Sequence, residues 1–467
     1  MEAFCSFCRP FPSVPREERC RFYTSLAVGL AAMFACGAPF AVFAVAEELT
    51  RSNRLNLTHF EAGCVTWSGV VGWSLALPAG LLYAKVSAMW LSVIGCVGST
   101  VSYLLLWSTV RAVHFYQKKT ILIALYAFFG GHSISYLYQA ALCVNLRNAT
   151  KRHAGKVLGI LHVPLAAFPM VLERFLTISG LVDSLAGAVF LVELAVIAGA
   201  SFLSILGLRA SPAGSQVIAR QSTFPDVRAF TTRAYEYPQS DSESVESVDD
   251  DDQAQIISSD RQLNPASLAP IQDVSWSFAS LQLFDLISVR FQFMIWSFVF
   301  SCAPTFALFW SICYRSSLTE LTVFTLCTCL ARGLGGHVSD AARSSVSRGN
   351  FLLVGLLLQF LAALMHLCDA HDHNSFLIFV GASAASFGLQ WCLIPTVIRE
   401  KFGLKRFPIF WSVVLLAFVI VAMLCHIVNV QILPLVCDAS QLRQLSVLLH
   451  AGMSLCAILF VCGLVDR

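Results

Sequence analysis

Long apolar stretches alternate with short polar connections along most of this chain. About 20 apolar residues are enough for a helix to cross the hydrocarbon core of a bilayer, and a helix satisfies its own backbone polar groups there. The pattern predicts an all-α integral membrane protein with twelve transmembrane helices in two six-helix bundles. The expected spans are residues 22–46, 62–84, 87–110, 120–145, 157–179 and 184–208, then 291–313, 317–335, 350–368, 375–397, 408–431 and 441–464.

The polar segment between the sixth and seventh spans has a different composition. Residues 209–284 contain eleven acidic and five basic residues, and the run SDSESVESVDDDD occupies positions 240–252. Like charges repel, and so little apolar surface cannot offset the entropy cost of folding. We therefore expect an acidic, disordered cytosolic linker. The full division is a cytosolic N-terminal segment at 1–21, a first bundle at 22–208, the linker at 209–284 and a second bundle at 285–467.

Composition narrows the class of function. Of the 467 residues 57% are hydrophobic and 13% are charged, whereas an ordinary soluble domain has about 25% charged residues. This balance argues against a nucleic-acid binder and a typical cytosolic enzyme. The chain also lacks the HExxH, GxSxG and Walker patterns that would place catalytic groups. We expect no enzyme activity, no cofactor and no metal site.

Basic residues in the short loops predict the orientation in the membrane. Lys and Arg are enriched in cytoplasmic loops, and an even number of crossings separates all the basic groups here, so one orientation places them together. Both termini should then be cytosolic. In that orientation the sequon at Asn56 lies in an outer loop, where it could be glycosylated. The basic groups lie at 9–21, 147–156, 343–348 and 399–406. The pattern does not distinguish the plasma membrane from an organelle membrane.

Two motifs carry a resemblance to a known family. Between the eighth and ninth spans the chain reads RGLGGHVSDAARSSVSR, in which Gly336, Asp340 and Arg343 fit a G-x-x-x-D-x-x-R loop. This resembles the gating loop of the major facilitator superfamily. Gly335 and Gly336 would allow close helix approach, while Asp340 and Arg343 could pair with each other or cap neighbouring helices.

A narrower resemblance lies at the end of the tenth span. The segment GLQWCLIPTVIREKFGL at 388–404 is similar to the W-x-x-x-P-x-x-x-x-E-x-F-G-L stretch of nodulin-like transporters, a branch of that superfamily. The residues that fit are Trp391, Pro395, Glu400, Phe402, Gly403 and Leu404. The resemblance implies the major facilitator fold and alternating access, in which two bundles rock around a central site lined mainly by the first, fourth, seventh and tenth helices. It also assigns Glu400 to the gating loop.

Polar groups inside the expected spans are the candidates for the site, because such groups usually face a cavity or a partner. Glu193, in the sixth span, is the candidate for carrying a coupling proton. Arg332 is expected to snorkel toward the cytosolic end of the eighth span. Residues 37–39 could break the first span. The candidates for the substrate cavity are His132, Ser135, Tyr136 and Gln139 in the fourth span, Trp296 in the seventh, and Gln390 and Trp391 in the tenth.

These expectations lead to one function and one alternative. The first is a secondary transporter that moves a small organic solute across a membrane by alternating access, with protons as the candidate coupling ion. The alternative is a membrane sensor or receptor that uses the same fold without moving its ligand. The expected partners are a small-molecule substrate and the lipid bilayer, and no nucleic acid.

Overall fold

The computed structural model describes residues 16–51, 55, 57–83, 85–181, 185, 187–209, 288–314, 318–369, 372–433 and 439–465. They all belong to one compact unit formed by the two ends of the chain. The expected linker at 209–284, except Arg209, and the sequon residue Asn56 lie outside the described residues. The domain boundaries therefore stay a prediction.

All regular secondary structure in the described residues is helical. The first-half elements are α2 (Arg16–Ala35), η1 (Ala38–Phe40), α3 (Val42–Arg51), α4 (His59–Ser74), α5 (Leu77–Tyr83), α6 (Ala88–Arg111), α7 (Val113–Tyr116), α8 (Thr120–Asn148), η2 (Lys151–His153), α9 (Ala154–Ser179) and α11 (Ala188–Gly207). The second-half elements are α16 (Val289–Tyr314), α17 (Leu318–Ala341), α18 (Arg348–Cys368), α19 (His373–Ile427), η6 (Val428–Ile432) and α21 (Ala439–Val465).

The longest element, α19, contains two spans. Within the described residues eleven helices are long and apolar enough to cross a membrane, and α19 alone has 55 residues. Inside it, Gly403 adopts φ 78° and ψ 167°, which is not a helical conformation. We call the parts of α19 before and after Gly403 span 10 and span 11. With this division the count is the expected twelve, and the all-α fold class is confirmed.

The connection between spans 10 and 11 differs from the expected one. The sequence pattern ends one span at 397 and begins the next at 408, yet the described helix continues through this interval apart from the bend at Gly403. Hydropathy marks where a segment leaves the hydrocarbon, and a helix can continue beyond that point because water does not disrupt its internal hydrogen bonds. The charged residues at 399–406 are therefore helical.

Local sequence signals explain where other helices begin and break. The first span is interrupted at Gly37, followed by the short 3₁₀ turn at Ala38–Phe40, as the sequence suggested. Proline fits this first turn because its missing N–H would have no partner there. Helix α4 begins with a capping box in which Thr58 and Glu61 exchange hydrogen bonds. Glu61 also accepts a hydrogen bond from Thr120 at 2.9 Å, which ties the start of α4 to the start of α8.

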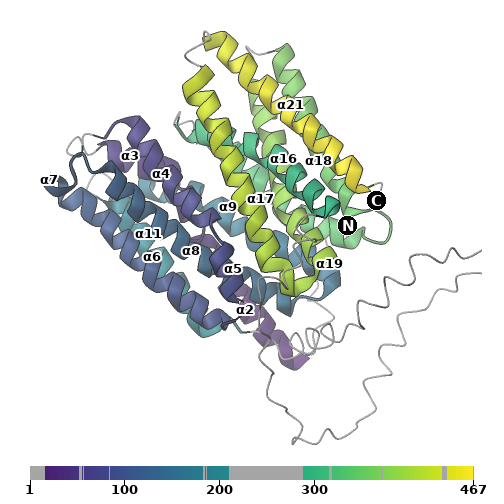
Figure 1. The fold of residues 1–467 in the computed structure, drawn as a ribbon, viewed down its shortest axis with the longest axis horizontal. Coiled ribbons are helices and arrows are strands. Elements are labelled where there is room, and N and C mark those ends of the chain that lie inside the picture. The colour runs from purple at the N-terminus through teal and green to yellow at the C-terminus, as the bar shows by residue number, and fades with distance from the viewer. Residues whose placement is uncertain are drawn as a thin grey trace, which may run out of the picture. The chain divides into compact units, whose positions relative to one another are not determined.

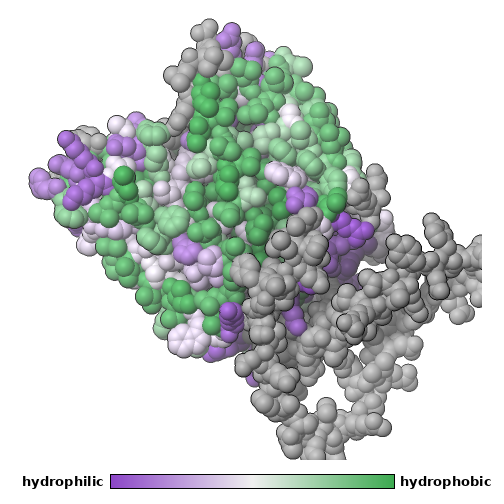
Figure 2. Space-filling view, in the orientation of Figure 1, coloured by the Kyte–Doolittle hydropathy of each residue, from purple (hydrophilic) through white to green (hydrophobic). Residues whose placement is uncertain are grey.

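The helices pack as two groups (Figure 1). In the first half α8 contacts α4 and α6, and in the second half α16 and α18 contact both α19 and α21. The two halves meet where α9 packs against α17 and where α4 and α5 pack against α19. Much of the visible surface is hydrophobic, and hydrophilic residues gather near α7 (Figure 2). Large apolar side chains such as Leu330, Leu334 and Leu361 are exposed, as expected for a multi-pass membrane protein whose outer surface contacts lipid.

Candidate functional site

A cavity lies between the two halves. Its volume is about 420 Å³, including the space that is open to solvent. Its walls come from the first, fifth, seventh and eighth spans and from span 10. The lining residues are Phe40, Leu165, Ala166, Pro169, Phe306, Phe309, Phe324, Thr325, Thr328, Arg332, Phe387 and Trp391. The site is therefore aromatic, and its polar groups are two hydroxyls, one guanidinium and the indole N–H of Trp391.

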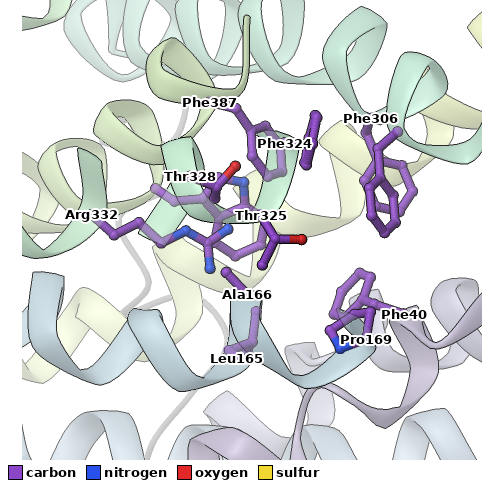
Figure 3. Close-up of a pocket in the computed structure, with 12 residues that line it drawn as sticks. Phe40, Leu165, Ala166, Pro169, Phe306, Phe324, Thr325, Thr328, Arg332 and Phe387 are labelled. Carbon is purple, nitrogen blue, oxygen red and sulfur yellow. The ribbon is translucent and has the colours of Figure 1, made fainter. Parts of the chain in front are cut away.

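Arg332 is the cationic group of this cavity. Its side chain points into the cavity from α17, between Thr328 and Leu165 (Figure 3). It is 2% exposed, so the expectation that it snorkels to the membrane edge is wrong. The guanidinium carbon lies 5.1 Å from the ring centre of Trp391 and 5.6 Å from that of Phe387. These rings offer their negative faces to the cation, which is worth about 2 kcal/mol when the pair is desolvated.

A chain of hydrogen bonds that begins at Arg332 crosses between the halves. Nη1 of Arg332 donates to the backbone oxygen of His162 at 2.8 Å. Nε2 of His162 lies 2.9 Å from the Tyr138 hydroxyl, which accepts a hydrogen bond from Nε1 of Trp411 at 2.8 Å. Because Nδ1 of His162 lies 2.9 Å from the Leu158 carbonyl, a neutral imidazole protonated on Nδ1 is consistent with the bonds of His162, Tyr138 and Trp411.

A second set of polar contacts joins the halves at the end where the basic loops lie, which we call the basic end. Asp340, near the end of α17, accepts hydrogen bonds from the backbone N–H groups of Gly155 at 3.2 Å and Lys156 at 2.7 Å. These amides belong to the first turn of α9, where they have no partner within the helix and where the helix dipole favours an anion. Of the two contacts expected for Asp340, the structure shows the capping one across the halves.

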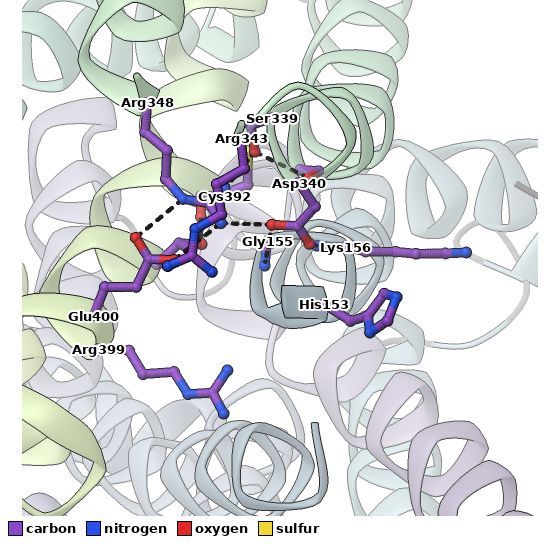
Figure 4. A network of polar contacts seen from close by, with 12 residues as sticks. His153, Gly155, Lys156, Ser339, Asp340, Arg343, Arg348, Cys392, Arg399 and Glu400 are labelled. Atoms are coloured by element: carbon purple, nitrogen blue, oxygen red, sulfur yellow. Dashed lines mark hydrogen bonds and ion pairs between the residues drawn. The ribbon is translucent and has the colours of Figure 1, made fainter. Parts of the chain in front are cut away.

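Arg348 holds this anion in place (Figure 4). Its Nη2 donates to Asp340 at 2.6 Å and to Glu400 at 3.1 Å, and its Nη1 donates to Ser339 at 2.6 Å. Arg343, which is more exposed, lies 3.4 Å from Glu400. The side chains of Asp340 and Arg348 are 6% and 5% exposed, so this ion pair is much better shielded from water than a typical surface pair. We call Asp340, Arg343, Arg348 and Glu400 the latch.

Arg399 adds a parallel contact between the halves. Its guanidinium donates to the backbone oxygens of Ala149 at 2.7 Å and Thr150 at 3.3 Å, which lie in the loop before α9. His153 lies in the same loop, outside the spans, with Nδ1 2.9 Å from the Thr150 hydroxyl. Partial burial lowers the pKa of the His153 imidazole, and the negative charge of Asp340 opposes this effect. At neutral pH the loop therefore contributes a neutral imidazole beside the latch.

Close backbone contact between α9 and α17 makes the latch geometry possible. A side chain on Gly336 would collide with the backbone oxygen of Gly155, and one on Gly159 would collide with the backbone oxygen of Arg332. Gly336 thus lies where the backbones of α9 and α17 come close together. The two helices approach closely enough for the Asp340 carboxylate to reach the α9 amides.

Aromatic rings join the halves on another part of their interface. Trp67 of α4 stacks on Trp310 of α16 with ring centres 4.2 Å apart, and His426 packs near both rings. Phe40 and Phe306, which line the cavity, also contact each other across the halves at 5.8 Å. Contacts between the halves therefore include an aromatic cluster in addition to the polar latch.

The expected candidates in the fourth span occupy other places. His132, Ser135, Tyr136 and Gln139 are not among the residues that line the cavity. His132 stacks on Phe128 and lies 3.4 Å from the Tyr136 hydroxyl, while Ser135 donates to the His132 carbonyl. Gln139 donates to Ser412 of span 11 at 3.0 Å. The fourth span thus contributes to helix packing and to contacts between the halves.

The remaining candidates divide between the interior and the surface. Trp391 lines the cavity, and the neighbouring Gln390 is fully buried with neither amide atom bonded to a described residue. Trp296 is 39% exposed and stacks on Phe300, so its expected place in the cavity is wrong. Glu193 lines a different void, with Thr66 and Tyr103 inside the first half. Among the described residues, no group of His, Cys, Asp and Glu is arranged to hold a metal ion.

Sequence reasoning missed the residues that link the cavity to the interface. Arg348, Arg399 and His162 were not candidates, and Arg332 was assigned to the membrane edge. Arg332 was placed at the edge because the apolar pattern ends at 335, whereas the helix extends to Ala341. The backbone acceptors of Arg399 carry no signal in the sequence, because every residue offers the same carbonyl group.

Comparison with solved structures identifies the fold. The chain matches the E. coli fucose:proton symporter FucP, in a single-residue variant, with a TM-score of 0.61 and 14% identity over 95% of this chain and 98% of that one. A second structure of FucP, a major facilitator superfamily transporter in the outward conformation, gives a TM-score of 0.59 and 14% identity over 95% and 99% of the two chains. The chain has the major facilitator fold. No family model matches it, and no curated protein matches it.

Proposed function

We propose that this protein is a secondary transporter that moves a small organic solute across a membrane by alternating access. The observation that carries the proposal is the cavity between the halves, together with contacts that close the interface beside it. A carrier needs a site that both halves build and a closure that can form and open. FucP, which has the same fold, is a proton symporter by its name. Protons are accordingly the candidate coupling ion here.

The nodulin-like branch remains our proposal for the nearer relatives. The motif residue Gly403 stands at the bend between spans 10 and 11, with a positive φ that favours glycine. Glu400 of the same motif belongs to the latch. A physical role for both residues supports the motif match. The basic residues gathered at this end support an orientation in which the basic end and both termini face the cytosol.

The alternative function is a sensor that binds a ligand without moving it. Both functions use the cavity, but only a carrier requires the halves to separate and close again during each cycle. A reversible cross-link between the halves therefore distinguishes them. The structure offers a suitable position, because Sγ of Cys329 on α17 lies 3.6 Å from the backbone oxygen of Val163 on α9.

We predict that oxidation of the Val163→Cys variant joins the new thiol to Cys329 and abolishes uptake into proteoliposomes. The solute for this assay is first identified by an untargeted metabolite comparison of cells with and without the protein. Reduction should restore uptake, because the cross-link prevents only the relative movement of the halves. The measurement is the initial rate of uptake before oxidation, after oxidation and after reduction.

A matched cross-link within one half is the control. Sγ of Cys425 lies 3.6 Å from the sulfur of Met453, and both residues belong to the second half. Oxidised Met453→Cys should keep its uptake, because its halves remain free to move. Full uptake by the oxidised Val163→Cys protein, once the cross-link is verified by mass spectrometry, would contradict alternating access. Ligand binding without saturable uptake by the unaltered protein would favour the sensor.

A further inference from the structure

The cavity holds a buried cation without a carboxylate partner. Arg332 is 2% exposed, and no described carboxylate lies within ion-pair distance of its guanidinium. Its donors have one acceptor, the His162 carbonyl, and its Nε is buried with no acceptor among the described residues. Arginine has five N–H donors and stays charged. Burying such a group without compensation is costly, so the site lacks an anionic component.

The nearby carboxylates are already used or lie elsewhere. Asp340, on the same helix, is bonded to Arg348 and to the first turn of α9. Glu193 lines the separate void inside the first half. Neither group therefore neutralises Arg332, and the cavity presents a net positive charge to whatever enters it.

We propose that Arg332 binds the carboxylate of a small organic monoanion, whose apolar body lies among the phenylalanine rings of the cavity. The guanidinium can offer two parallel N–H groups, which matches a carboxylate. The hydroxyl of Thr325 points into the same space (Figure 3). This proposal names the substrate class of the transporter proposed above. It rests on that function only where it assigns the anion as the transported solute.

The chemistry of the walls disfavours two other solute classes. A polyhydroxylated solute needs many hydrogen-bonding partners, and unmade bonds to buried polar groups cost binding strongly. Here the polar groups are limited to Thr325, Thr328, Arg332 and the indole N–H of Trp391, and Thr328 already donates to the Ala384 carbonyl at 3.2 Å. An organic cation would meet Arg332 with no carboxylate in the lining. A monoanion with an apolar body satisfies both the charge and the aromatic walls.

The position of Arg332 connects this anion to the movement of the halves. Its Nη1 bond to His162 joins α17 to α9, and so reaches from the second half to the first. A carboxylate on the remaining donors would lie at this interface. The anion is therefore bound where separation of the halves would expose it.

Equilibrium binding to the purified full-length protein tests the proposal without any need for transport. The probes are acetate, isovalerate, benzoate and 3-phenylpropionate, each compared with its neutral amide by calorimetry and by thermal shift. We expect at least one acid with an apolar body to bind and its amide to bind at least 30-fold more weakly, as loss of one partner of a buried charged pair costs about that factor. Absence of binding by every acid, or equal binding of acid and amide, would overturn the proposal.

Variants locate the binding to Arg332. Arg332→Met should abolish the preference for the acid over its amide, and Arg332→Lys should keep part of it because the charge remains but the planar fork is lost. The matched control is Arg111→Met, because Arg111 also packs on a tryptophan, Trp107, at 5.4 Å but is exposed. It should bind the acid as the unaltered protein does. An unchanged preference in Arg332→Lys and Arg332→Met would overturn the assignment.

The two proposals fail in different ways. Binding of an acid that depends on Arg332, without uptake into proteoliposomes, would retain the anion site and reject the transporter. Saturable uptake of a neutral solute that none of the acids inhibits would retain the transporter and reject the anion site.

Discussion

At the residue scale, Glu193 is a buried carboxylate without a hydrogen-bond partner among the described residues. It is fully buried in the sixth span, and neither carboxylate oxygen accepts a hydrogen bond from a described residue. An ionised carboxylate in apolar surroundings is costly, and such groups within membrane spans often belong to proton pathways. Its void does not include the residues of the central cavity. A coupling role for Glu193 would therefore act through the packing of the first half.

We predict that Glu193→Gln removes the dependence of uptake on an imposed proton gradient. For one proton carried per solute, one pH unit changes the accumulation ratio about tenfold, and the amide cannot carry that proton. The measurement is uptake into proteoliposomes with and without the gradient. Glu61→Gln is the control, since Glu61 is bonded to Thr58 and Thr120 at the start of α4. If Glu193→Gln responds to the gradient like the unaltered protein, Glu193 does not carry the proton.

The sequence shows which polar and aromatic residues each span contains, but it predicts their depth in the membrane and their partners less well. Trp391 was expected in the cavity and lines it. Arg332 was placed too near the surface, because the apolar pattern ends at 335 whereas the helix continues to Ala341. Trp296 has the same residue type as Trp391 but faces outward. The face that a helix turns inward depends on its neighbours, and a single span carries little information about them.

At the element scale, the bend in α19 fixes how spans 10 and 11 enter the interface. Gly403 combines φ 78° with ψ 167°, a region that only glycine occupies readily. This turn sends Trp391 to the cavity on one side and Trp411 to the hydrogen-bonded chain on the other. The motif glycine was visible in the sequence, but its conformation was not, because the expected connection was a loop of about ten residues.

We predict that Gly403→Ala destabilises the folded protein by about 1–3 kcal/mol, the usual cost of a strained backbone conformation. Gly452→Ala is the control, because a Cβ at either position meets no atom within 4 Å and Gly452 lies inside α21. Alanine there should change stability by less than about 1 kcal/mol, in the stabilising direction. Unfolding in mixed detergent micelles measures both. Equal effects of the two variants would show that the backbone at Gly403 is not strained.

At the scale of the whole molecule, the two halves could be predicted from the sequence more reliably than the contacts between them. Apolar length gave the twelve spans, because the bilayer imposes the same requirement on each of them. The cavity walls were expected from the fourth span and instead include the fifth and eighth. The reason is that α8 packs tightly on α4 through Gly72 and Gly131, and uses Tyr138 and Gln139 for bonds to other helices.

The same close packing on the α9–α17 side makes closure of the basic end sensitive to one glycine. A side chain on Gly159 would collide with the Arg332 carbonyl across the interface. We predict that Gly159→Val holds α9 and α17 apart and breaks the bonds from the α9 amides to Asp340. In the Val163→Cys background it should slow oxidative cross-linking to Cys329 by at least about tenfold. That factor is equivalent to about 1.4 kcal/mol against the closed state. Gly199→Val is the control, since a Cβ at Gly199 meets no atom within 4 Å. It should leave the cross-linking rate unchanged. If the cross-linking rate with Gly159→Val equals that of this control, closure does not depend on the contact between α9 and α17. The latch would then have to form from a different arrangement of the halves.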